Sequence, residues 1–445
     1  MRWFTAYRRQ NWLRLYFILS VCLVLFAYGV VVGLFKIFPY YTFQSVVGAG
    51  IEWMRYPQHK LRITPQKFLA PTNREGAGVV LHVEGKAYPG ETFFEGFFGN
   101  GNGMRLIDMN GGTIHEWRVS FNEIWPEAPH MEHTPHDWDI GIHGAFLYPN
   151  GDVIFNFHYG GLVRIDKCSR VQWKLPHQTH HAIFQDMDGN LWVPGRKLRK
   201  TPLDKFPNVP APFQEEYLLQ VSPDGDILRE ISILDVIFGS KFEGVLFANG
   251  AHEAQIKVPF DHDFTHLNDI EVLMPQMAPA FPQFEAGDLL ISLRNVNLLL
   301  VLSPKSERIK WSMTGPYLRQ HDPDFLATGR ISVFDNRRDG HNGRIFGGSR
   351  ILELAPLTGA IVTVYGEKGD EPFFTDQGGD HQRLPNGNIL ITETEAGHVF
   401  EVTAAGDIVW SFVNRWDDHS VAAIRRATRF PEHYMASMEQ EACHD

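Results

Sequence analysis

The stretch from Leu384 to Val413 reads LPNGNILITETEAGHVFEVTAAGDIVWSFV. It begins with a turn that ends in glycine, followed by an apolar run, a short connection and a second apolar run. A second glycine turn then leads into a third run, which contains a tryptophan. Short apolar runs bounded by Asn-Gly and Ala-Gly turns are hairpin signals. The stretch therefore predicts consecutive antiparallel strands of one small sheet.

The same order of turns and apolar runs recurs along the chain. Units of this kind begin at Val79, Leu147, Asp186, Glu285, Leu326 and Leu384. Repetition at about 40 to 60 residues, with four strands per unit, is the signature of propeller blades. The sequence thus predicts an all-β fold, a six-bladed β-propeller. Tryptophans at matching outer-strand positions are interpreted as structural, because large aromatics pack between blades more often than they bind ligand. These are Trp117, Trp173, Trp311 and Trp410.

The composition agrees with a turn-rich β protein. Of the 445 residues, 44% are hydrophobic and 13% aromatic, with 40 glycines and 27 prolines. These values are ample for a core and indicate many tight turns. The net charge is −11, and no basic run after residue 15 is longer than RKLRK at Arg196 to Lys200. Nucleic acid, which needs a clustered cationic surface, is not expected as a partner.

The N-terminal region predicts a membrane anchor. No charged residue occurs from Leu15 to Phe35, and four arginines precede this segment. Such a span is long enough to cross the hydrocarbon core as a helix. No A-x-A-like cleavage site follows directly, so an uncleaved signal anchor is favoured over a cleaved signal peptide. The arginines should stay in the cytoplasm. The chain is therefore expected to be a single-pass protein of the inner (cytoplasmic) membrane, with its propeller on the periplasmic or extracytoplasmic side.

The expected organisation follows from these segments. It comprises a basic cytoplasmic N-terminus at 1–14, the transmembrane anchor at 15–35, a linker at 36–75, the propeller at 76–415 and a C-terminal tail at 416–445 that packs on the propeller. The three cysteines form no disulfide framework. Cys168 and Cys443 could pair in an oxidising compartment, but their sequence separation leaves the pairing open.

Histidines stand at a regular distance before the glycine turns. His143, His181 and His321 each precede a turn glycine by eight residues, and His381 precedes one by six. His266 heads the fourth unit. If the strand before each turn is the innermost one, these histidines converge on the mouth of the central channel. The alternative for any single one is a histidine that only hydrogen-bonds the neighbouring blade.

The convergence favours a binding site. With Arg294 and Asn268, the histidines form a set of nitrogen donors that suits an anionic ligand better than a packed core. A second cluster, His130, His133 and His136, is interpreted as a polar loop, because adjacent prolines argue against a helix that would align them for a metal. No metal or other cofactor is expected.

Several motifs carry a resemblance to a known family. They read QTHHAIFQDMDGNLW, HLNDIEVL with LISLRN downstream, QHDPDFLATGRISVFDN, DHQRLPNGNILITETEAGHVFEV and AIRRATRFPEHY. In this order they resemble the arylsulfotransferase (arylsulfate sulfotransferase) family of six-bladed propellers, over about residues 76 to 434. That family moves a sulfuryl group from an aryl sulfate to a phenolic acceptor through a sulfated histidine, without a nucleotide donor.

The resemblance implies roles for particular residues. His321 of the QHD motif corresponds to the sulfated histidine, and catalytic partners are implied at His181, His266, Asn268 and Arg294. His143 and His381 are expected to bind substrate, because they are predicted to converge on the same channel mouth. An aryl sulfate donor and a phenolic acceptor are the expected partners, and the chemistry requires no metal.

Two features depart from the family pattern. Known bacterial members have a sizeable N-terminal β domain associated with dimerisation, whereas here only about 40 residues separate the anchor from the first blade. The oligomeric state therefore stays open. An insertion at Met274 to Phe284 is expected near the active-site mouth. The alternative function is a catalytically silent propeller that serves as an accessory or scaffold subunit of a membrane complex.

Overall fold

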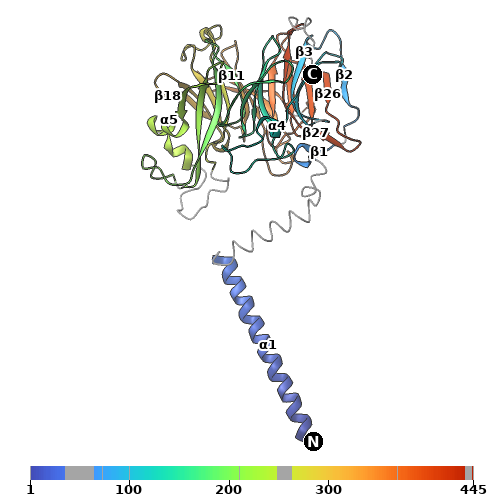
Figure 1. The fold of residues 1–445 in the computed structure, drawn as a ribbon, viewed down its shortest axis with the longest axis vertical. Helices are drawn as coiled ribbons and strands as arrows, with labels where there is room; N and C mark the ends of the chain where they lie inside the picture. The colour runs from blue at the N-terminus through green and yellow to red at the C-terminus, as the bar shows by residue number, and fades with distance from the viewer. Residues whose placement is uncertain are drawn as a thin grey trace. The chain divides into compact units, whose positions relative to one another are not determined.

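The computed structural model describes residues 2–35, 65–72, 74–99, 101–209, 211–247, 263–367, 369–435 and 443. The chain divides into two compact units, Met1–Pro65 and Gln66–Asp445. The first contains one long helix, α1 (Arg2–Phe35) (Figure 1). Its segment Arg14–Phe35 has a mean hydropathy of 2.7 and is long and apolar enough to span a membrane. Most of the expected linker at 36–75 lies outside the described residues.

The second unit is a six-bladed β-propeller of antiparallel sheets. Blade one contains β28 (Ile424–Phe430), β3 (Glu91–Phe98), β4 (Gly101–Ile107) and β5 (Thr113–Arg118). Blade two contains β6 (Ile142–Leu147), β7 (Val153–Phe157), β8 (Gly161–Ile165) and β9 (Val171–Leu175). Blade three contains β10 (Gln178–Thr179) and β11 (Phe184–Gln185), both paired with β12 (Leu191–Arg199), then β13 (Phe213–Val221) and β14 (Ile227–Ser232).

The remaining blades follow the same plan. Blade four contains β15 (Leu267–Val272), β16 (Leu289–Leu293), β17 (Leu298–Ser303) and β18 (Arg308–Thr314). Blade five contains β19 (His321–Phe325), β20 (Ile331–Asp335), β21 (Arg350–Leu354) and β22 (Ile361–Tyr365). Blade six contains β23 (Asp380–Arg383), β24 (Ile389–Glu393), β25 (His398–Val402), β26 (Ile408–Val413) and β2 (Gly78–His82).

Short helices lie between the blades or between strands of one blade. The helices are α4 (Phe121–Ile124), α5 (Ile233–Gly239), η1 (Gln66–Phe68), η2 (Glu243–Phe247), η3 (Ala278–Ala280) and η4 (Arg294–Val296). A two-stranded sheet joins β1 (Leu69–Pro71) to β27 (Ser420–Ala422). The labels of β1 and β27 lie side by side in Figure 1.

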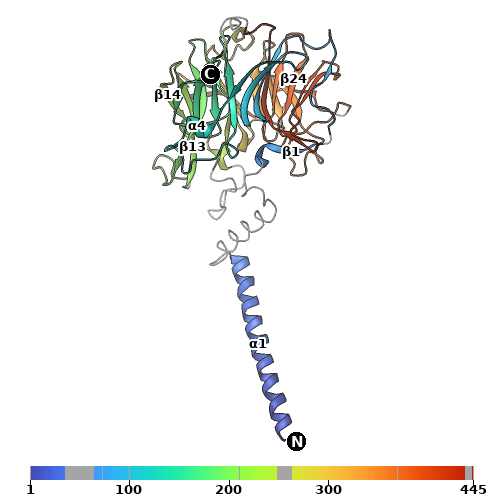
Figure 2. The same cartoon turned by 45° about the vertical axis from the view of Figure 1, so that its right-hand side comes forward.

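The two ends of this unit close the ring, which corrects two sequence expectations. The strand β28 is the innermost strand of blade one, where Phe430 pairs with Glu91 of β3, so the propeller extends beyond residue 415. The strand β2 pairs with β26 and is the outermost strand of blade six, not part of the first blade. Figure 2 shows blue strands from the start of the unit beside orange and red strands from its end. The local pattern indicates that a strand exists but not which distant strand it pairs with.

The core lies between the blades. The second strands are apolar on both faces, as in Leu289–Leu293, because each sheet packs against two neighbours. The outer-strand tryptophans also join the blades. The indole N–H groups of Trp117, Trp173 and Trp410 donate to backbone oxygens in turns of the next blade. These contacts agree with the structural role assigned to the tryptophans from the sequence.

The insertion at Met274 to Phe284 lies at the opposite end of blade four from the expected mouth, which corrects that expectation. In the antiparallel pair β15–β16, Leu267 faces Leu293 at one end and Val272 faces Leu289 at the other. The insertion follows Val272. Its Phe281 and Phe284 are buried and pack against blade five. The insertion therefore adds to the inter-blade core rather than reshaping the cavity described below.

A disulfide joins Cys168 to Cys443, with their Cα atoms 5.4 Å apart. Cys168 lies in the turn between β8 and β9, so the bond ties the end of the chain to blade two. The sequence had left this pairing open. Cys22, in α1, is a free cysteine.

Candidate active site

A cavity of about 150 Å³ lies where the innermost strands begin. All six blades contribute a residue from that end of the innermost strand. These residues are Arg425 from blade one, His143, His181, His266 and His321 from blades two to five, and Gly378, which precedes the innermost strand of blade six. The cavity is therefore on the propeller axis, at one end of the central channel.

The structure brings most of the predicted site residues together. His143, His181, His266, His321 and Arg294 all line this one cavity. The ring centroids of His143 and His181 are 3.9 Å apart, and those of His181 and His266 are 5.0 Å apart. The shared spacing before the glycine turns therefore reflects a shared position at the head of the innermost strand.

Asn268 lies one step deeper than these residues. It lines an adjoining pocket of about 50 Å³, which also contacts His321. Its amide N–H donates to the carbonyl of Gln320 at 2.7 Å, directly before His321 in the chain. One donor of Asn268 is thus engaged in holding the backbone that carries His321.

His381 does not line either pocket, contrary to the expectation that it lies at the mouth. Its side chain is fully buried against Asp322 and Asp324. The physical reason is its spacing. His381 stands two residues closer to its turn glycine than the other histidines do, and two residues along a strand keep the same face but move further down the channel.

The cavity also contains residues that sequence reasoning missed. One of them is His158, which directly follows the second strand β7, just as the predicted Arg294 follows β16 and Asn336 follows β20. Because the second strand runs antiparallel to the first, its end lies beside the head of the innermost strand. The residue after each second strand was therefore a usable signal. Lys67 and Arg425 also line the cavity, but they come from segments outside the repeats.

The hydrogen bonds of His321 define its tautomer. Nδ1 lies 2.7 Å from Oδ1 of Asn336 and 3.0 Å from the carbonyl oxygen of Arg319. The Asn336 amide nitrogen donates to the carbonyls of Thr375 and Gly378, which fixes its oxygen toward the imidazole. Both neighbours of Nδ1 are acceptors, so Nδ1 carries the proton. Nε2 accepts a long bond of 3.3 Å from the N–H of Gly378, and it therefore presents a lone pair.

Burial keeps this imidazole neutral. Burial, and next the nearby charge of Arg294, lower the pKa of His321 to about 3. An unprotonated Nε2 at a cavity is the arrangement that a nucleophilic imidazole requires.

His266 forms a dyad with Asp263. The backbone N–H of His266 donates to Oδ1 of Asp263 at 2.9 Å, and Nδ1 of its ring bonds to the other carboxylate oxygen. Burial alone would raise the pKa of Asp263, but the contacts with His266 outweigh it and lower that pKa. Nε2 of His266 is buried without a hydrogen-bond partner in the described part of the chain. This geometry suits a general base whose protonated form is stabilised by a carboxylate.

A second chain of polar groups lies behind His181. Its Nδ1 is 2.7 Å from Nδ1 of His180, and Nε2 of His180 is 3.8 Å from Oε1 of Glu216. Burial, followed by the charge of Asp263, raises the pKa of Glu216 to about 8. Burial and neighbouring histidines hold the pKa values of His180 and His181 well below their usual range. These imidazoles are therefore neutral contacts for a ligand rather than additional cations.

Two of the cavity histidines have a strained backbone. His181 and His266 have φ angles of 56° and 50°, in the left-handed region that L-residues avoid. Such conformations cost roughly 1–3 kcal/mol each and persist where the surroundings over-determine them, often at functional sites. In blade two the corresponding strand head carries Gly144, with φ +106°. A Cβ there would lie 1.7 Å from the carbonyl oxygen of His181.

The cavity is electrostatically suited to an anion. Lys67, Arg294 and Arg425 line it, and none of its described lining residues is a carboxylate. Burial, then the neighbouring charge of Arg319, lowers the pKa of Arg294 to about 10, so the guanidinium remains charged at neutral pH. Cations without an anionic partner in the lining of a cavity favour a negatively charged ligand.

The fold and the site define a six-bladed propeller with an axial cavity lined by cationic side chains and by an unprotonated imidazole nitrogen. The family model described as Arylsulfotransferase (ASST) matches residues 145–415 of the 445-residue chain. Because this match covers more than half of the chain, the protein belongs to the arylsulfotransferase family. No curated protein matches the sequence.

Several solved structures are similar in fold. A protein of unknown function from Bacteroides caccae has a TM-score of 0.47 and 12% identity, covering 76% of this chain and 98% of its own. A streptogramin B lyase has a TM-score of 0.40 and 12% identity, covering 78% and 88%. A virginiamycin B lyase from Staphylococcus aureus has a TM-score of 0.35 and 12% identity, covering 62% and 71%. Similarity at this level does not indicate function.

Proposed function

We propose that the protein is a membrane-anchored arylsulfotransferase that moves a sulfuryl group from an aryl sulfate to a phenolic acceptor through a sulfated His321. The observation that carries the proposal is the unprotonated Nε2 of His321 at a cavity lined by Lys67, Arg294 and Arg425. These cations have no anionic partner in the cavity lining, and an aryl sulfate would supply one. A silent scaffold would not require this arrangement.

In the donor half-reaction, the lone pair on Nε2 of His321 forms an N–S bond while the S–O bond to the aryl group breaks. The bonding electrons leave with the aryl oxygen as a phenolate. Nδ1 keeps its proton, and its bond to Asn336 stabilises the positive ring that results. Arg294 and the other cations stabilise the negative charge that develops on the sulfuryl and leaving oxygens. The N–H of Gly378, displaced from Nε2, becomes available to a sulfuryl oxygen.

In the acceptor half-reaction, Nε2 of His266 removes the proton of the incoming phenol, and Asp263 stabilises the imidazolium. The phenol oxygen then forms an S–O bond as the N–S bond breaks, which returns the electron pair to His321. His266 then releases this proton to solvent, from which the departed phenolate takes up a proton, so the overall reaction balances. The neutral rings of His143 and His181 are suited to contact the aryl group of either substrate.

The location proposed for this chemistry is outside the cytoplasm. The helix segment Arg14–Phe35 supplies an uncleaved signal anchor, and the arginines before it favour retention of the N-terminus in the cytoplasm. The disulfide between Cys168 and Cys443 supports an oxidising compartment for the propeller.

Turnover of a chromogenic aryl sulfate with a phenol acceptor tests the proposal. The wild-type protein is expected to release the coloured phenol continuously only when acceptor is present, beyond the single equivalent that sulfation of His321 releases, and His321→Asn should abolish both. The matched control is His433→Asn, at an exposed position with φ 60° that asparagine tolerates. Absence of acceptor-dependent release in the wild type would favour the scaffold alternative, and activity in His321→Asn would remove His321 from the mechanism.

A further inference from the structure

A group of acidic residues lies further along the innermost strands, below the cavity, and takes no part in the proposed reaction. It comprises Asp269 and Glu271 of β15, Asp322 and Asp324 of β19, and Asp380 of β23. Arg426 of β28 pairs with two of these residues, Asp322 at 2.7 Å and Asp380 at 2.6 Å. Five carboxyl groups therefore share one guanidinium in the interior of the propeller.

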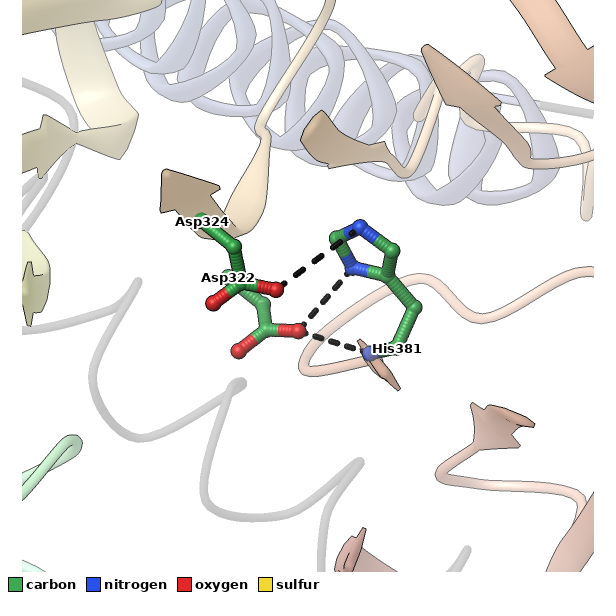
Figure 3. A group of neighbouring side chains, drawn as sticks. All are labelled: Asp322, Asp324 and His381. Carbon is green, nitrogen blue, oxygen red and sulfur yellow. Dashed lines mark hydrogen bonds and ion pairs between the residues drawn. The ribbon is translucent and has the colours of Figure 1, made fainter. Parts of the chain in front are cut away.

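His381 points its ring into this group, between Asp322 and Asp324 (Figure 3). Oδ2 of Asp322 accepts the backbone N–H of His381 at 2.6 Å and lies 3.0 Å from Nδ1 of its ring. The other oxygen of this carboxylate, Oδ1, pairs with Arg426 at 2.7 Å. Asp322 is thus an acceptor on both sides, and Nδ1 of His381 carries the proton.

The other ring nitrogen of His381 has no hydrogen-bond partner among the residues that the structure describes. Nε2 makes no hydrogen bond within the described residues, although the side chain is 0% exposed. It faces Oδ2 of Asp324 at 4.0 Å. That separation is too long for a hydrogen bond, yet it accommodates an ion about 2.0–2.2 Å from each atom. Buried polar atoms in native proteins are usually satisfied, so this lone pair indicates a missing ligand.

The surrounding charge also favours a cation. Asp322 and Asp380 pair with Arg426, whereas the only basic group within 4.0 Å of the Asp324 carboxylate among the described residues is the His381 ring. A bound cation would pair with this carboxylate.

We propose that Nε2 of His381 and the carboxylate of Asp324 bind a divalent metal ion below the cavity, with Asp322 orienting the histidine. A metal-ligating histidine characteristically donates its second ring N–H to a carboxylate, as His381 does to Asp322. Ligand atoms of Asp322, Asp324 and His381 lie within 4.8 Å of one another. Imidazole with carboxylates suits Mn²⁺ or Zn²⁺.

The site would join two blades next to the reacting histidine. Asp324 lies three residues after His321 in β19, and His381 lies in β23 of the next blade. A metal ion here would act as a positioning element for the strand that carries His321. The binding claim does not depend on sulfuryl transfer, and it departs from the expectation of a metal-free protein.

Metal binding to the full chain in detergent, after removal of bound ions with a chelator, tests the site. Mn²⁺ and Zn²⁺ are titrated separately, and Mn²⁺ samples are examined by pulsed electron paramagnetic resonance for coupling to an imidazole nitrogen. About one ion per chain is expected, with nitrogen coupling. Asp324→Asn and His381→Phe should each weaken binding at least 10- to 100-fold, as losses in a metal site do. The exposed Asp418→Asn is the matched control.

Two results would overturn the site. One is wild-type protein that takes up neither metal at millimolar concentration. The other is bound Mn²⁺ without imidazole coupling, or with affinity unchanged in both variants. The nitrogen coupling is measured on the wild type, so the test stands even if a variant fails to fold.

Discussion

Asp263→Asn is expected to separate the two half-reactions. In the wild type, both carboxylate oxygens of Asp263 accept bonds from His266, one from its backbone N–H and one from its ring. An asparagine has one acceptor oxygen, which the backbone N–H will retain. Its NH₂ group then faces Nδ1 of the ring, so Nδ1 must become the acceptor and the proton must move to Nε2. The nitrogen that takes the acceptor's proton is thereby blocked.

The size of the effect follows from these contacts. A catalytic histidine held in the wrong tautomer loses on the order of 10⁴-fold in rate, so the acceptor step should slow by about that factor. Replacing charge-assisted bonds with neutral ones should lower the free energy of unfolding by about 1 kcal/mol, which leaves the fold intact. His321 keeps its own hydrogen bonds, so sulfation of the enzyme should continue.

Rapid mixing with a chromogenic aryl sulfate distinguishes the steps. Asp263→Asn should give a burst of about one coloured phenol per active site, followed by almost no turnover with acceptor present. Asp418→Asn should behave as the wild type. Loss of the burst itself would show that Asp263 serves the donor step, and steady turnover near the wild-type rate would refute the role of the dyad.

Three further predictions concern the cavity and the ring closure. Arg294→Met should lower kcat/KM by roughly 10²–10³-fold with little change in thermal unfolding, since one charge-stabilising group is lost; an undiminished kcat/KM would contradict its role. Gly144→Ala should lower the free energy of unfolding by more than about 1 kcal/mol in urea titrations, because its Cβ meets the carbonyl of His181; unchanged stability would contradict this close approach. Under native isolation, alkylation should label Cys168 and Cys443 only after reduction, so labelling without reductant would contradict the disulfide.

The blades could be predicted from the sequence because each is a local unit. Every blade carries its own glycine turns and apolar runs, and hairpin pairing follows from residues close together in the chain. The closure of the ring could not be predicted in this way. The strands Gly78–His82 and Ile424–Phe430 pair with strands at the other end of the unit. The residue pattern of a strand does not specify which distant strand it pairs with.

In the site, too, the features set by local sequence could be predicted and those set by distant segments could not. The histidine spacing predicted which residues head the innermost strands, and the difference of two residues at His381 carried the information that it lies deeper. Lys67 and Arg425 could not be predicted from the repeats, because they belong to the segments that precede and close the propeller. Asp263 lies outside the strands, and only its contact with His266 reveals its place in the dyad.

The most direct test of the central claim is peptide mapping by mass spectrometry of wild-type protein quenched after incubation with an aryl sulfate and no acceptor. One sulfuryl adduct is expected, on His321, and it should disappear when a phenol is added before the quench. Full turnover with no adduct on His321, or an adduct on another histidine that turns over at the same rate, would contradict it.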